Sequence, residues 1–219
     1  MRDVAIILAA TLALGGCIDF PQSAKREPIQ RSTAALTPRP ETRQCLAGLG
    51  AAHANFTPLP DEYYGAGCST VGTVRLAALQ SDDAALALSN LGPVTCPLAQ
   101  TFAAWARFGV DRAAQQILGS RLVKIETMGS YSCRNVAGSS RRSAHATAGA
   151  IDVSAFVLAD GRRISISGAW NAGTPAERRF LGVIHTSACK RFGIVLGPAY
   201  NAAHRDHLHV ELGGRAFCR

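Results

Sequence analysis

Four of the six histidines of this 219-residue chain lie in two short segments that also contain acidic residues. One segment runs from His145 to Asp152, and the other is residues 204–209, with the sequence His-Arg-Asp-His-Leu-His. A hydrolytic zinc site uses three protein ligands, usually histidines with one carboxylate, and leaves a fourth position for water. The two segments together therefore indicate a metal-dependent hydrolytic site, and the alternative is a set of solvated surface histidines.

The spacing within the segments limits which elements can bring these side chains together. His207 and His209 point to the same face if they lie on a strand, because alternate strand residues share a face. Glycine and β-branched residues between His145 and Asp152 argue against a helix there. A loop that carries His145 into a strand that carries Asp152 would bring the two together.

The hydrophobic pattern predicts an α+β fold, in which an antiparallel sheet carries the zinc site and packs with helices. Residues 97–108 and 111–118 have helical spacing. A capping box over 174–177, with proline at the first helical position, starts another helix that Gly193 stops. The segment 69–95 gives no interpretable pattern. Strands are expected over residues 122–131, 150–158, 163–167, 194–196 and 207–212.

Composition restricts the class of protein further. With 47% hydrophobic and 17% charged residues, the chain can form a globular core, which excludes collagen-like and coiled-coil proteins. Outside the first 20 residues no stretch is long enough to span a bilayer, which excludes multi-pass membrane proteins. The net charge of +8 favours an acidic lipid or an acidic cell-wall polymer as partner. No basic run is interleaved with aromatic residues, so nucleic acid is not expected.

The N-terminus predicts export. Arg2 and the apolar run over 4–14 have the features of a signal peptide, and the residues before Cys17 resemble a bacterial lipobox. We therefore expect a lipoprotein-type signal peptide at 1–16, acylation of Cys17, and a proline-containing flexible linker at 17–43 before a domain at 44–219. An ordinary signal peptide with a chance cysteine is the alternative. Ile18, rather than aspartate, favours the outer membrane, with the protein facing the periplasm.

The cysteines agree with an oxidising compartment. Six remain after Cys17, and no two are close enough in sequence for a zinc-thiolate knuckle, so we expect up to three disulfides. A Cys189–Cys218 bond would hold the C-terminal strand on the preceding helix, and Cys133 is assigned to Cys96 in preference to Cys45. The six candidates are Cys45, Cys68, Cys96, Cys133, Cys189 and Cys218.

Two resemblances carry the functional prediction. Ser-x-His at 143–145 with Asp152, followed by Asp-His-x-His at 206–209, resembles the zinc peptidases that cut peptidoglycan stem peptides. These include D-alanyl-D-alanine carboxypeptidases, murein endopeptidases and lysostaphin-type enzymes. Residues 130–134, 188–192 and 195–204 resemble the bacterial extensin-like C-terminal domain family, and that similarity extends from about Cys45 to Cys218.

The resemblance to the zinc peptidases implies roles for individual residues. His145, Asp152 and His209 would bind one Zn²⁺. Carboxypeptidase-type relatives place a glutamate three residues before the last ligand, where this chain has Asp206, whereas endopeptidase-type relatives use the first histidine of the pair, here His207. We expect Asp206 to be the general base, with His207 stabilising developing negative charge. Arg134 is expected to bind a carbonyl or carboxylate of the substrate.

The resulting prediction is a zinc-dependent hydrolase of peptidoglycan stem peptides or cross-links, a metallopeptidase of the cell envelope. Peptidoglycan and the membrane, through the lipid anchor, are the expected partners, and a monomer is the expected state. The alternative is a lipoprotein that binds the cell wall without cleaving it and whose metal is structural or vestigial. Asp206 is one methylene shorter than the glutamate of carboxypeptidase-type relatives, so its reach to a metal-bound water is in question. This keeps the alternative open.

Overall fold

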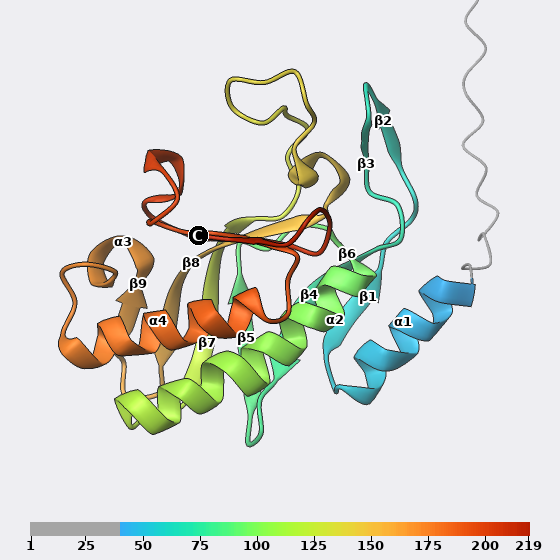
Figure 1. Ribbon diagram of the computed structural model, residues 1–219. Coiled ribbons are helices and arrows are strands. Elements are labelled where there is room, and N and C mark those ends of the chain that lie inside the picture. The colour runs from blue at the N-terminus through green and yellow to red at the C-terminus, as the bar shows by residue number, and fades with distance from the viewer. Residues whose placement is uncertain (1–39) are drawn as a thin grey trace, which may run out of the picture. The chain divides into compact units, whose positions relative to one another are not determined.

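The computed structural model describes residues 40–219 (Figure 1). The predicted signal peptide, the predicted acylation site Cys17 and most of the predicted linker lie outside the described residues. Within residues 40–219, no helix is long and apolar enough to cross a membrane.

The described part begins with helix α1 (Pro40–Ala51), which includes residues 40–43 that the sequence analysis assigned to the linker. Glu41 in the first turn interacts favourably with the positive end of the helix dipole. Cys45 and Leu49 are buried one turn apart, so one face of α1 packs against the rest of the domain. Within the described residues, 40–43 are therefore helical.

Ten strands form one mixed sheet, in the order β1-β4-β5-β7-β8-β11-β10-β12, with β6 beside β4 and β9 beside β8. Most pairs are antiparallel, as expected, but β5 pairs with β7, and β10 with β12, in parallel. The helical segment over 96–118 connects β5 and β6 to β7 and is long enough to return the chain for a parallel pair. The strands of this sheet are β1 (Asn55–Pro58), β4 (Thr73–Gln80), β5 (Ala85–Ser89), β6 (Val94–Thr95), β7 (Leu122–Gly129), β8 (Ala150–Leu158), β9 (Arg163–Ser165), β10 (Ile194–Leu196), β11 (Leu208–Glu211) and β12 (Phe217–Cys218).

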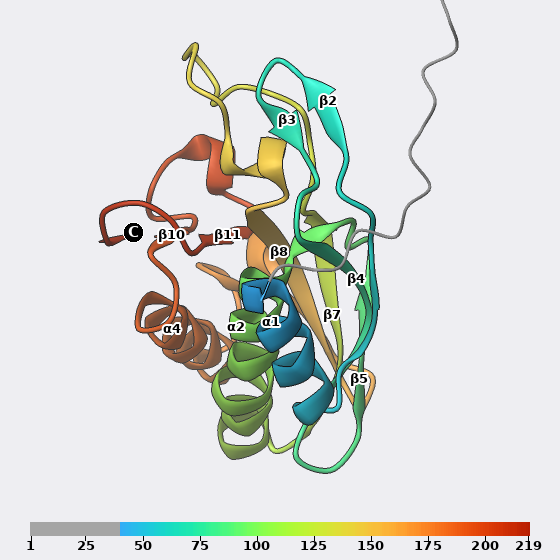
Figure 2. The same cartoon turned by 90° about the vertical axis from the view of Figure 1, so that its right-hand side faces the viewer.

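The long helices lie on one face of this sheet, as Figure 2 shows for α1, α2 and α4. The predicted helices over 97–108 and 111–118 form one nearly continuous helical segment, in which α2 is followed by two π-helical turns. A separate two-stranded hairpin, β2 (Tyr63–Gly65) with β3 (Cys68–Ser69), projects beyond the sheet. The helices after α1 are α2 (Cys96–Ala104), η1 (Trp105–Asp111), η2 (Ala114–Leu118), η3 (Ala144–Thr147), α3 (Ile166–Ala169), α4 (Pro175–Cys189) and η4 (Ala202–His204).

The capping box predicted for α4 is present. The Thr174 side chain accepts a hydrogen bond from the Glu177 backbone N–H, and the Glu177 carboxylate accepts one from the Thr174 backbone N–H. Pro175 fills the first helical position, where no N–H is needed. The apolar stripe of α4 is buried against the sheet and against η1, where Trp105 Nε1–H donates to the Ile184 carbonyl at 3.1 Å.

Three disulfides link the described elements. The Cys189–Cys218 bond is confirmed and joins the end of α4 to β12. The pairing of Cys133 with Cys96 is wrong, because Cys133 pairs with Cys68 on the β2–β3 hairpin and Cys96 pairs with Cys45. Cys45 and Cys96 lie on the packed helices α1 and α2, whereas the hairpin brings Cys68 to the loop over 130–143.

Candidate metal centre

The three predicted ligands come from three elements that meet at one end of the sheet. Asp152 on β8 and His209 on β11 are directly opposite each other in an antiparallel pair. His145 lies on the short helix η3, which Ser143 caps by accepting a hydrogen bond from the His145 backbone N–H. Ser143 therefore holds the loop that delivers His145, and the turn ends at Ala148 in the left-handed region, with φ 53°.

The donor atoms of these residues converge. His145 Nε2 lies 3.1 Å from Asp152 Oδ2 and 3.2 Å from His209 Nδ1. His209 Nδ1 lies 2.9 Å from Asp152 Oδ1. Two ligands of a tetrahedral zinc ion, each about 2.0–2.1 Å from the metal, are about 3.3 Å apart. Both the donor set and its spacing therefore fit one zinc ion, while metal binding itself stays a prediction.

Both histidines are oriented by a second hydrogen bond. His145 Nδ1–H donates to the Ser130 carbonyl at 3.1 Å, so the Nε2 lone pair faces Asp152. His209 uses the opposite arrangement, in which Nε2 lies 3.4 Å from Glu211 Oε2 and Nδ1 faces the site. Partners of this kind fix the orientation of metal-binding histidines. Glu211 was not predicted, although strand alternation after His209 would place a carboxylate two residues later on the same face.

Electrostatics keep the carboxylate charged. Burial by itself would raise the pKa of Asp152, but hydrogen bonds with His145 and His209 outweigh it and lower that pKa below its usual range. Burial by itself would lower the pKa of His209, but the carboxylates of Asp152 and Glu211 raise it to about 9. An ionised Asp152 suits a metal ligand, whereas a proton on His209 Nδ1 competes with a metal.

Asp206 and His207 form a pair at the edge of the three ligands. His207 is buried, and its Nε2 lies 3.6 Å from Asp152 Oδ1. Its Nδ1–H donates to Asp206 Oδ1 at 2.9 Å, and this hydrogen bond lowers the pKa of Asp206. The strand β11 begins at Leu208, one residue later than expected. The residue that faces the ligands is His207, and Asp206, the expected base, contacts the far side of the His207 ring.

Two further residues surround the site. Arg134 is exposed in the loop over 130–143 and donates to the Asn135 carbonyl at 3.5 Å, so its guanidinium is accessible to a ligand. His204 lies beside the ligands, with its ring 5.1 Å from that of His207 and 5.9 Å from that of His209. Burial, reinforced by His207, His209 and Arg134, lowers the pKa of His204 to about 4, so its ring is neutral at pH 7.

Comparison with known families identifies the family of this chain. The family model described as the extensin-like protein C-terminus matches residues 43–219. The chain belongs to this family. The match includes every strand of the sheet and all three candidate ligands, while the relation of the extensin-like domain to zinc peptidases stays a prediction. Searches of curated proteins and of solved structures found no match.

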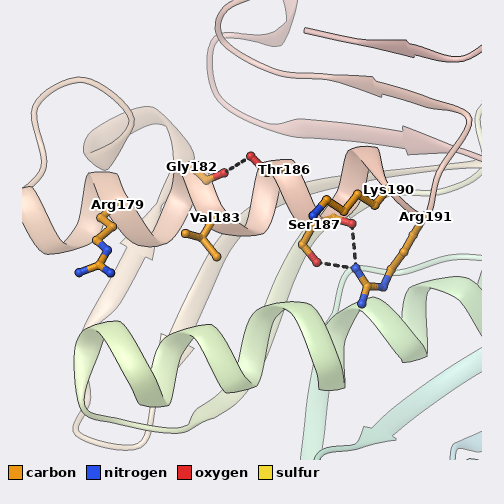
Figure 3. Close-up of a pocket in the computed structure, with 7 residues that line it drawn as sticks. All are labelled: Arg179, Gly182, Val183, Thr186, Ser187, Lys190 and Arg191. Atoms are coloured by element: carbon orange, nitrogen blue, oxygen red, sulfur yellow. Dashed lines mark hydrogen bonds between the residues drawn. The ribbon is translucent and has the colours of Figure 1, made fainter.

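Other features of the extensin-like domain do not form an alternative metal site. His185, Cys189 and Cys218 lie close together, but the two sulfurs are bonded to each other and cannot serve as thiolate ligands. A hollow of about 490 Å³ on α4 contains no histidine or carboxylate (Figure 3). Its lining residues are Arg179, Gly182, Val183, Thr186, Ser187, Lys190 and Arg191.

Zinc affinity of the extensin-like domain is expected to rise with pH up to about 9. The raised pKa means that His209 carries a proton over most of this range, and zinc must displace that proton. One released proton weakens the apparent affinity by up to about tenfold for each pH unit below the pKa. Calorimetric titration with zinc in two buffers of different ionisation enthalpy measures the number of protons released. An affinity that is constant between pH 6 and 9 would contradict this assignment.

Glu211→Gln is expected to weaken zinc binding by about 10- to 100-fold, the usual effect of removing a carboxylate partner of a metal-binding histidine. The amide keeps the size of the side chain but removes the carboxylate that orients the His209 ring and makes its Nδ1 a stronger donor to a metal. The affinities are compared near pH 9, where the proton on His209 competes least with zinc. Competition with a chromogenic chelator measures the affinity. Glu126→Gln is the matched control, because that carboxylate instead pairs with Arg163 and Lys124. An unchanged affinity in Glu211→Gln would show that Glu211 does not support the ligand.

Proposed function

We propose that this extensin-like domain is a zinc-dependent hydrolase of peptidoglycan stem peptides or cross-links. The observation that carries the proposal is the convergence of His145 Nε2, Asp152 and His209 Nδ1, with His207 Nε2 at their edge. A zinc ion held there would supply Lewis acidity, which polarises a scissile carbonyl and makes water a nucleophile at neutral pH.

The protein groups around the ligands suit hydrolysis. Because His207 donates its Nδ1–H to Asp206, its Nε2 carries the lone pair and can accept a proton from a water molecule at the site. The ionised Asp206 carboxylate holds this tautomer and stabilises the imidazolium that forms. This arrangement favours His207 as the general base and Asp206 as its orienting partner, which reverses the preference drawn from the sequence.

Three features favour a peptidoglycan substrate. The resemblance of the two histidine segments is to enzymes that cut stem peptides, and these peptides carry carboxylates. The net charge of +8 attracts an acidic polymer, and the exposed Arg134 can pair with a carboxylate. The three disulfides agree with an exported protein that works in the cell envelope. Anchoring through Cys17, placement in the outer membrane and a monomeric state belong to the same proposal.

Incubation of the purified protein with defined muropeptides, followed by mass analysis of the products, tests this proposal. We expect cleavage of a stem-peptide or cross-link bond that a chelator abolishes and added zinc restores. Cleavage in the presence of chelator would contradict the metal-dependent mechanism. Binding of muropeptides without any product would instead support a cell-wall-binding lipoprotein.

A further inference from the structure

A series of aromatic rings extends from the candidate metal centre to the surface. The ring of His204 lies 5.9 Å from that of the ligand His209, and the ring of Tyr200 lies 5.4 Å from that of His204. The ring of Phe217 lies 5.5 Å from that of Tyr200. We call Tyr200, His204 and Phe217 the aromatic strip. Tyr200 is 43% and Phe217 is 41% exposed, so the outer end of the aromatic strip faces solvent. The two rings pack edge to face, at 78°, and the Arg219 guanidinium lies 5.9 Å from the centre of the Phe217 ring, so each ring offers its own face to a ligand.

The backbone of the aromatic strip is fixed from both sides. Phe217 precedes Cys218, which is bonded to Cys189 at the end of α4, and its backbone N–H donates to the Gly193 carbonyl at 2.9 Å. The Tyr200 backbone N–H donates to the Gly197 carbonyl at 2.9 Å. Aromatic side chains held in this way lose little conformational entropy on binding, which is why they are favoured at binding surfaces.

Because the aromatic strip begins beside the candidate metal centre, its ligand should be another part of the same molecule that occupies that centre. The small methyl and carboxylate groups of a stem peptide offer little flat apolar surface to an aromatic ring. The saccharide to which that peptide is attached offers a flat face of C–H groups that can stack on an aromatic ring, and hydroxyls that can reach the Tyr200 hydroxyl.

We propose that the aromatic strip binds a saccharide ring of the glycan strand that carries the peptide, so that the protein recognises glycan-linked peptides in preference to free ones. This inference rests on the proposed function for the identity of the substrate. It does not depend on cleavage, because the stacking surface consists of Tyr200 and Phe217 and neither residue is a candidate ligand or base.

The experiment compares two ligands with the same stem peptide, one carrying its disaccharide and one without it. Each is titrated calorimetrically into chelator-treated protein, so that neither zinc nor turnover affects the result. We expect tighter binding of the disaccharide-peptide. Tyr200→Ala and Phe217→Ala should each reduce that preference by about two- to tenfold, the usual range for one aromatic contact, and leave the affinity for the free peptide unchanged.

Two further variants control for folding and for general surface effects. Tyr200→Phe keeps the ring and should keep most of the preference. Tyr63→Ala removes a tyrosine that is 74% exposed on the β2–β3 hairpin, and it should leave the preference unchanged. Equal affinity of the wild-type protein for both ligands, no binding of either, or an equal loss in Tyr63→Ala would overturn the proposal. If the protein cleaves muropeptides but binds free and glycan-linked peptides with equal affinity, this inference alone fails. If it prefers the glycan-linked peptide but cleaves neither, only the proposed hydrolase activity fails.

Discussion

His145→Ala is expected to abolish stoichiometric zinc binding. The variant removes one of three donor atoms that lie 2.9–3.2 Å apart, and a water molecule in its place would lack the orienting hydrogen bond from His145 Nδ1 to the Ser130 carbonyl. The loss should exceed the roughly 10- to 100-fold effect expected for Glu211→Gln, because an outer partner acts only through its ligand. Metal analysis after gel filtration measures the stoichiometry.

A matched control separates metal binding from a general effect of losing a histidine. His53 is exposed and has φ 54°, a left-handed conformation that asparagine tolerates, so His53→Asn should keep one zinc ion per chain. Near-UV circular dichroism of the metal-free proteins shows whether His145→Ala keeps its tertiary packing. A folded His145→Ala variant that still binds one zinc ion would refute the ligand assignment.

His207→Ala is expected to lower the turnover of muropeptides by about two to four orders of magnitude while one zinc ion stays bound, which is the usual effect of removing a general base. Asp206→Asn should lose less activity, because the amide can still accept the hydrogen bond from His207 Nδ1 but no longer stabilises the imidazolium. Steady-state kinetics with a defined muropeptide, together with metal analysis, measures both effects.

If the two variants rank in the opposite order of activity loss, Asp206 is the general base. If Asp206→Asn loses activity by the larger factor and His207→Ala keeps it, then Asp206 abstracts the proton, as in carboxypeptidase-type relatives. Arg205→Lys is a useful control, since it removes the hydrogen bond to the Ala202 carbonyl but keeps the positive charge that helps lower the pKa of Asp206. We expect it to keep full turnover.

Local chemistry made much of the site predictable. The alternation of His207 and His209, and the acid that follows His145 after seven residues, indicated a metal site before any fold was known, and the resemblance to zinc peptidases named the candidate ligands. Asp152 and His209 are cross-strand neighbours, and the sequence placed each on a strand without specifying that these two strands pair. The capping box at Thr174 was equally local, because both of its hydrogen bonds lie within four residues.

Features that depend on distant contacts were not predictable. The Cys68–Cys133 bond requires the β2–β3 hairpin to meet the loop over 130–143, and no pattern in either segment specifies this meeting. Residues 69–95 contain β4, β5 and the two-residue β6, separated by turns such as the one after β5, where Asn90 has φ 58°. The parallel pair of β5 and β7 follows from the helical connection, which hydrophobic spacing alone does not place relative to the sheet.

The roles of Asp206 and His207 depended on a single backbone detail. The sequence predicted the strand but not the path of the backbone just before it, which determines whether Asp206 or His207 turns toward the ligands. With β11 starting at Leu208, the Asp206 carboxylate contacts His207 Nδ1, while His207 Nε2 faces Asp152. The path of the loop before β11, rather than the start of the strand, therefore makes His207 the candidate base.

Anomalous diffraction at the zinc edge, from crystals of the protein grown with one equivalent of zinc, tests the metal centre most directly. We predict one strong peak, about 2.0–2.2 Å from His145 Nε2, an Asp152 carboxylate oxygen and His209 Nδ1. A crystal without a peak at these three residues, or with its zinc ion bound elsewhere on the chain, would contradict the proposed metal centre.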